Sequence, residues 1–189
     1  MTISALELNR ATLERQLLLS RERLNVADGL RRVVALQAQH PASPYIALWN
    51  RLADFDPAEL DAAFADRSVV KATLMRVTLH AVHADDYRDF HTAMQPTLRA
   101  ARLNDRRFTG TGFTGADADA LVPDALEFAN VPRTNADAEA WVSERLGTPA
   151  ERVWWALRHY APFFHAPTGG PWAFGQRPAY VASGYPPAA

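Results

Sequence analysis

The 189-residue chain contains no cysteine. It can therefore form neither disulfides nor metal sites built from thiolates. No apolar run approaches the ~18 residues of a membrane-spanning helix, and residues 1–9 lack the basic and then apolar pattern of a secretory signal. We expect a cytoplasmic protein with no membrane partner. Because 48% of the residues are hydrophobic, the chain can bury a core.

An excess of positive charge is missing as well, because the formal net charge is −1. Proteins that bind nucleic acids usually display a basic patch. The overall charge of this chain therefore does not favour a nucleic-acid partner. The arginines nevertheless gather at 21–32 and 99–107, whereas the acids concentrate at 54–66 and 117–144. The arginine clusters fit either phosphate contacts or solvated helix faces.

Common motifs of metal binding and catalysis are also absent. The six histidines are scattered, and none stands in a His-Glu-x-x-His motif. No Gly-x-Ser-x-Gly segment marks a nucleophilic serine. The glycine-rich segment 108–115 is not followed by the Gly-Lys-Ser or Gly-Lys-Thr of a phosphate-binding loop. We expect no metal and no cofactor.

Apolar residues at helical spacing, together with capping residues, predict four helices in the first part of the chain. They cover 9–20, 25–36, 44–52 and a segment that begins at Asp56-Pro57. Val, Thr and Leu then dominate 68–82, which predicts a pair of strands. Helical patterns resume at 84 and again over 96–107.

Three glycines within 108–115 indicate a joint between two units. Beyond it, helices are predicted at 116–130, 134–147 and from 148 onward, and short apolar stretches follow at 163–166, 172–174 and 180–182. In both halves, helices are followed by a small ribbon, which is the order of a winged helix-turn-helix unit. We predict a mainly α fold with small β wings, built from tandem winged helix-turn-helix units. The predicted parts are unit 1 at 1–108, the joint at 109–115, unit 2 at 116–182 and a tail at 183–189.

Gln37 and Gln39 stand just before Pro41, which cannot continue a helix. We predict that both amides lie at a helix-to-helix corner. Glutamine does not ionise and is no ordinary general base, but its carbonyl oxygen can orient a water or stabilise a cationic sugar. Such a pair suits excision of an N-alkylated purine, a good leaving group. The alternative is that the amides cap the helix end and support the turn, and their spacing alone favours that alternative.

Several segments together resemble a known family. They are Asn9-Arg10, Arg15-Gln-Leu-Leu18, Leu36-Gln-Ala-Gln-His-Pro-Ala-Ser-Pro-Tyr45 with Leu48-Trp49-x-Arg51-Leu52, and Leu74-Met-Arg-Val-Thr-Leu-His80 with Asp85-Asp86-Tyr87. In residues and order they resemble the AlkZ/YcaQ-like winged-helix DNA glycosylases, which unhook interstrand crosslinks and remove bulky N-alkylated purines. The resemblance runs from residue 6 to residue 182.

The resemblance implies tandem winged-helix units around a concave DNA channel, and monofunctional chemistry without a metal or a lysine Schiff base. The family's Gln-x-Gln or Gln-x-Asp signature matches Gln37 and Gln39. Gln39 would position the attacking water, and Gln37 would hold that water or stabilise the oxocarbenium-like sugar. The implied partner is double-stranded DNA with alkylated purines, which a monomer would hold in an open cleft as part of DNA repair.

The chain departs from the family in two ways. Many members read Met-Arg-Gly-Thr-Leu-His, where this chain has Val77 in place of the glycine. Full members also continue into a third winged-helix unit and a small β-rich part. We therefore expect a fragment or a truncated relative that has lost some phosphate contacts and, with them, affinity for DNA.

Three hypotheses follow. The first is a hydrolytic DNA glycosylase with Gln37 and Gln39 as catalytic residues, and the second is a winged-helix DNA-binding protein without catalysis. The third is an inactive remnant that binds nothing, in keeping with the near-zero net charge. In a DNA complex, the predicted phosphate contacts are Arg31, Arg32, Arg76, Arg102, Arg106 and Arg107.

Overall fold

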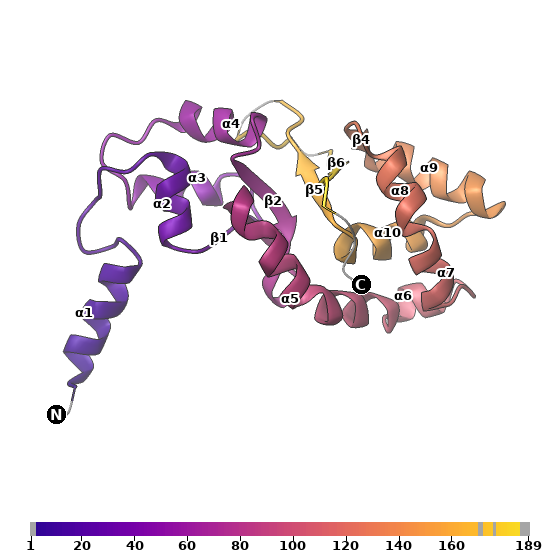
Figure 1. Ribbon diagram of the computed structural model, residues 1–189, viewed down its shortest axis with the longest axis horizontal. Helices are drawn as coiled ribbons and strands as arrows, with labels where there is room; N and C mark the ends of the chain where they lie inside the picture. Colours follow the sequence, from indigo (N-terminus) through magenta and orange to yellow (C-terminus); the bar gives the residue numbers. More distant parts are fainter. Residues whose placement is uncertain (1–2, 170–171, 176, 186–189) are drawn as a thin grey trace.

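The computed structural model of the protein describes residues 3–169, 172–175 and 177–185. These residues form a mainly helical fold around one six-stranded antiparallel sheet (Figure 1). The helices are α1 (Ala5–Arg15), α2 (Val26–Arg32), α3 (Ser43–Trp49), α4 (Pro57–Ala65), α5 (Ala84–Leu103), α6 (Arg106–Thr109), α7 (Gly115–Ala120), α8 (Val122–Phe128), α9 (Asn135–Leu146) and α10 (Glu151–Tyr160). The strands are β1 (Leu36–Gln37), β2 (Val69–Thr73), β3 (Leu79–His83), β4 (Arg133–Thr134), β5 (Phe163–Ala166) and β6 (Ala179–Ala182). Residues 186–189 of the predicted tail lie outside the described residues.

Several helices begin and end where the sequence pattern predicts. The side chain of Asn25 accepts a hydrogen bond from the backbone N–H of Asp28 and caps α2. Thr134 forms a reciprocal capping box with Asp137 at the start of α9. That helix ends at Gly147, whose φ of 66° suits glycine.

The first helix differs from its prediction. It begins at Ala5, after a capping box between Ser4 and Glu7, rather than at Asn9. It projects from the rest of the molecule (Figure 1), and none of its 11 residues is buried. Leu13, Leu17 and Leu18 stand at helical spacing and predict a stripe that faces the core. That prediction is wrong for the helix, because of these three only Leu17, beyond its end, is buried.

Two prolines act differently from each other in the later helices. Pro96 does not interrupt α5, where it lies on the exposed side of a continuous helix. Pro123 stands in the first turn of α8, which suits its fixed φ and missing N–H. The predicted helix 116–130 is accordingly two helices, α7 and α8, that meet at Leu121.

The paired strands join into a single sheet with the order β1-β3-β2-β5-β6-β4. The predicted pair at 68–82 is confirmed as β2 and β3, with Val69 opposite His83. Lys71 pairs with His165 and so connects β2 to β5 of the second half. The mainly helical fold is thus confirmed, but the β structure is a continuous sheet, larger than two separate small wings.

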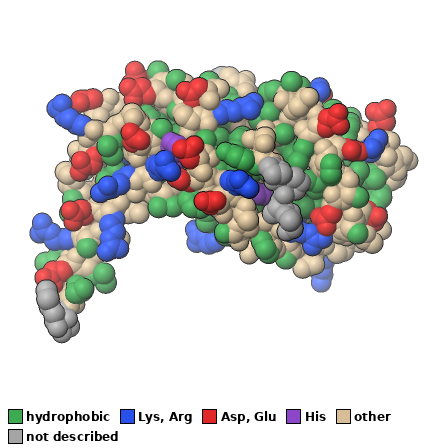
Figure 2. All heavy atoms as spheres, in the orientation of Figure 1, with side chains coloured by type: hydrophobic (Ala, Val, Ile, Leu, Met, Phe, Trp, Pro, Cys, Tyr) green, Lys and Arg blue, Asp and Glu red, His purple; other side chains and the backbone are tan. Residues whose placement is uncertain are grey.

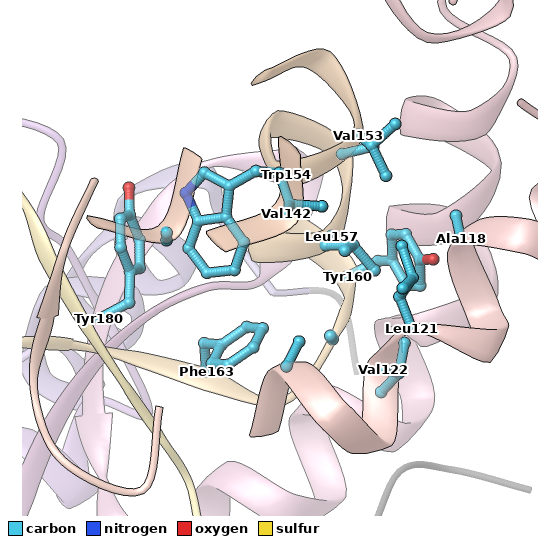
Figure 3. Close-up of a cluster of buried hydrophobic side chains, with 14 of the residues drawn as sticks. Ala118, Leu121, Val122, Val142, Val153, Trp154, Leu157, Tyr160, Phe163 and Tyr180 are labelled. Carbon is cyan, nitrogen blue, oxygen red and sulfur yellow. The ribbon is translucent and has the colours of Figure 1, made fainter. Parts of the chain in front are cut away.

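Buried side chains from both halves pack together. Figure 3 shows the cluster around Trp154 and Tyr160 of α10. The same cluster includes Leu98, Leu103 and Phe108 of the first half. A second cluster lies mainly in the first half, and Phe174 reaches it from the second. Further buried residues of both halves lie on the sheet. The division into units at 109–115 stays a prediction.

Candidate functional site

Gln37 lies in a strand at the edge of the sheet. Helix α2 ends at Arg32, and Val34 has a φ of 75°, which no right-handed helix accommodates. Gln37 pairs with His80, and the N–H of Ala38 donates to the carbonyl of Leu79 at 2.8 Å. The predicted helix-to-helix corner is therefore wrong, because an edge strand separates α2 from α3.

Both amides are exposed at the edge of the sheet, Gln37 within the strand and Gln39 two residues further along the chain. Successive side chains of an extended chain point to opposite faces. Leu36 and Ala38 are buried, whereas Gln37 and Gln39 are exposed. Within the described structure, α2 ends without a glutamine cap and α3 has no side-chain cap. The alternative in which the two amides cap a helix is therefore wrong.

Gln39 is held by the neighbouring strand. Its Oε1 accepts a hydrogen bond from the backbone N–H of Leu79 at 3.3 Å. An amide oxygen has two lone pairs, so this contact fixes the oxygen and leaves a second acceptor position. Gln39 also lines a pocket of about 770 Å³, to which β2, β5, β6 and α10 contribute.

Lys71, the only lysine in the sequence, lines the same pocket from the middle of β2. Its side chain is only 4% exposed, and Nζ lies over the ring of Phe174 at 4.4 Å from the centroid. Burial lowers the pKa of Lys71 to about 8. Sequence reasoning missed this residue, although a lysine within a run of β-branched and apolar residues was an available signal.

Two of the predicted phosphate contacts stack on one tryptophan. The Arg102 guanidinium lies over the Trp155 ring at 4.8 Å and lines the pocket. Arg107 lies over the same ring at 4.2 Å and pairs with Asp105 at 2.7 Å. Arg106 is exposed beside them on α6. The structure thus brings Arg102 and Arg107 together, and it places only Arg102 in the pocket.

The other three arginines lie in the first half. Arg31 is within 3.5 Å of Asp85 and 3.0 Å of Asp86, so acids already offset its charge. Arg32 is exposed at the end of α2, and Arg76 is exposed in the turn between β2 and β3. Figure 2 shows acidic and basic side chains interspersed over the visible face. The six arginines are distributed over α2, the turn between β2 and β3, α5 and α6.

The turn that carries Arg76 has an unusual backbone. The N–H of Thr78 donates to the carbonyl of Met75, which makes Arg76 and Val77 the central residues. Their φ values are 55° and 59°. Two left-handed central residues define a type I′ turn, in which Asn-Gly is preferred. Val77, the departure noted in the sequence, therefore occupies a position suited to glycine, and it too lines the pocket.

The fold and the site define a class: a mainly helical protein whose antiparallel sheet carries an exposed amide pair beside a cation-lined pocket. The family model of the DNA glycosylase AlkZ-like proteins matches residues 30–186, and the chain belongs to this family. No curated protein matches the chain.

A solved structure shows the same fold. The chain is similar to Streptomyces sahachiroi DNA glycosylase AlkZ, with 21% sequence identity and a TM-score of 0.77. The similarity covers 97% of this chain and 50% of AlkZ. This chain therefore spans half the length of that protein. None of the described helices combines the length and apolar character that a membrane crossing demands.

Proposed function

We propose that the chain is a monofunctional DNA glycosylase that hydrolyses the N-glycosidic bond of N-alkylated or crosslinked purines in double-stranded DNA. Family membership supports glycosylase chemistry. The observation that carries the proposal is the exposure of Gln37 and Gln39 at the edge of the sheet, with Gln39 at the pocket. Gln39 orients the attacking water, and Gln37 steadies that water or the sugar.

The chemistry needs no ionisable side chain. An N-alkylated purine carries a positive charge, takes the bonding electrons when the glycosidic bond breaks, and leaves as a neutral base without a general acid. Cationic character then develops on the sugar, where amide oxygens stabilise it. Water adds to the anomeric carbon and releases its proton to solvent. The hydrogen bond from Leu79 holds Gln39 Oε1 in place for this step.

We further interpret the helices and paired strands of each half as winged helix-turn-helix units that bind duplex DNA as a monomer. The likeness of the fold to AlkZ supports this interpretation. Such a protein would act in cytoplasmic repair of alkylation damage and interstrand crosslinks.

The test is release of free base from a duplex that carries one N7-methylguanine, measured by chromatography. Gln39→Ala is expected to slow release by about 10² or more. Gln39→Asp, which retains an oxygen able to orient water, is expected to keep more activity. Gln95→Ala, on α5, serves as the control and should act like the unaltered protein. Absence of release by the folded protein, or full activity of Gln39→Ala, would refute the proposal.

A second candidate function is DNA binding without catalysis. The cations that line the pocket favour it. Binding that weakens steeply with salt, without release of a base, would support this second function. Binding that does not change between low and moderate salt would count against it.

A further inference from the structure

The pocket beside Gln39 concentrates positive charge. Its described lining includes four cationic side chains and no carboxylate. The cations are Lys71, Arg102, Arg158 and Arg177. Because the whole chain has a formal net charge of −1, this lining is far from the average composition of the protein.

The charges in the pocket repel one another. Burial lowers the pKa of Arg102, and the charges of Arg107 and Arg158 lower it further, while the charge of Asp105 opposes them. Burial, together with the same three guanidinium groups, lowers the pKa of His159 to about 4. Burial and the charges of Lys71 and Arg158 lower the pKa of His165 to about 3. Both imidazoles are therefore neutral at pH 7, and an anion would relieve the repulsion among the remaining cations.

Neutral partners hold the guanidinium groups in place. Arg158 donates to the Tyr180 hydroxyl at 3.0 Å and to the side-chain oxygen of Asn135. Arg102 rests on the Trp155 ring. The Nε atoms of Arg102 and Arg158 are buried, and the described structure gives neither a hydrogen-bond partner. Within the described structure, Arg102 and Arg158 are thus positioned without a direct carboxylate partner, as expected for a preformed anion site.

We propose that Lys71, Arg102 and Arg158 form a binding site for one phosphate of the DNA backbone. Two arginines and a lysine match the charge and the acceptor oxygens of a phosphodiester. A cationic alkylated purine would be repelled by the same groups, so the damaged base stays outside the pocket, on the side of Gln37. The assignment of the phosphate to DNA rests on the proposed function. The binding of a phosphate group as such rests on the charges that line the pocket.

The first test uses inorganic phosphate and the full chain. Thermal unfolding is followed at pH 7.5 in phosphate and in chloride at equal ionic strength. Phosphate is expected to raise the unfolding temperature of the unaltered protein, and Arg158→Gln and Arg102→Gln should reduce that increase. Arg145→Gln, the matched control at an arginine that pairs with Asp124 outside the pocket, should keep it. An equal increase in all four proteins would mean that the pocket is no phosphate site.

A second measurement covers variants that fail to fold. Since Lys71 is the only lysine, reductive ¹³C-methylation gives one side-chain signal besides the terminal amine. Phosphate is expected to shift the titration of that signal to higher pH, because an anion favours the charged amine. Free N7-methylguanine should leave the titration unchanged. A response to the base and not to phosphate would overturn the proposal.

A third measurement identifies the source of the phosphate. DNA binding is measured against salt concentration, and each Arg→Gln substitution should lower the slope of log Kd on log salt by about 1. In duplexes with one neutral methylphosphonate each, one position should weaken binding of the unaltered protein but not of Arg158→Gln. Phosphate binding without this DNA effect would refute the backbone assignment. If Arg158→Gln releases the base as fast as the unaltered protein does, the phosphate site is refuted. The proposed glycosylase function would then still stand.

Discussion

Val77 provides a stringent test of the structure, because a β-branched residue rarely adopts a left-handed φ. Its φ is 59° in the type I′ turn between β2 and β3. For a residue other than glycine, the left-handed conformation costs about 1–2 kcal/mol. The half-buried Val77 side chain also packs against the α10 core, which contributes about 1 kcal/mol. Glycine adds about 0.5–1 kcal/mol of unfolded-state entropy. Since these effects nearly cancel, Val77→Gly should change the free energy of unfolding by less than about 1 kcal/mol.

The comparison with alanine isolates the backbone contribution. Val77→Ala loses most of the same packing but keeps the left-handed penalty. At ordinary positions alanine is more stable than glycine by about 0.5–1 kcal/mol. At position 77 the order should reverse, with glycine more stable by about 0.5 kcal/mol or more.

Urea unfolding of both variants measures this difference. Val142, fully buried within α9, is the control. There, alanine should be more stable than glycine by about 1 kcal/mol because the position is helical. If alanine is favoured by the same margin at 77 and at 142, the strain assigned to the turn is absent.

Two further predictions concern charged residues. The pKa of Lys71 is about 8 in the folded protein and about 10.4 in an unfolded chain. Between these two pH values the folded state binds fewer protons than the unfolded state, so the free energy of unfolding rises with pH. Lys71→Met should therefore be more stable than the unaltered protein at pH 7 by up to about 3 kcal/mol. In urea unfolding at increasing pH, this gain should shrink toward pH 10, and a difference that does not depend on pH would contradict the lowered pKa of Lys71. Arg31 is already paired with Asp85 and Asp86, so Arg31→Gln should lower the salt slope of DNA binding by much less than 1, and a full unit of change would show that DNA displaces the acids.

Local signals predicted where α2 begins but not where it ends. Asn25 and Asp28 are three residues apart, and their hydrogen bond depends on nothing distant. The apolar residues 33–36 fit the inner face of a helix equally well. What ends the helix is the left-handed Val34 and the pairing of Leu36 with Ala81, 45 positions along the chain. A two-residue strand is too short to show an alternating pattern, so β1 could be found only by its partner.

The sequence indicated individual residues of the candidate site but not which of them come together in the fold. Gln37 and Gln39 stand out because two amides precede a proline, whatever the local structure. Arg102 was named because arginines cluster near it in the sequence, but its pocket neighbour Arg158 lies on another helix of the second half. Nothing in the sequence places these two side chains together. Their proximity results from the packing of α10 against α5.

The order of the strands sets the distance between the proposed chemistry and the proposed phosphate site. Gln37 pairs with His80 on β3, and His80 pairs with Ala72 on β2, next to Lys71. Two steps of about 4.8 Å between strands and one residue along a strand separate the Cα atoms of Gln37 and Lys71 by about 10 Å. Ala72 shares the face of Gln37, so the Lys71 side chain points to the opposite face, and the amide and the ammonium group are separated by roughly 15 Å. A duplex rises about 3.4 Å per base step, so the bound phosphate should lie roughly three to five nucleotides from the damaged purine. In the methylphosphonate series, the sensitive position should fall within that interval. A sensitive position more than about six nucleotides away would mean that the amide pair and the cations cannot serve one bound strand in this geometry.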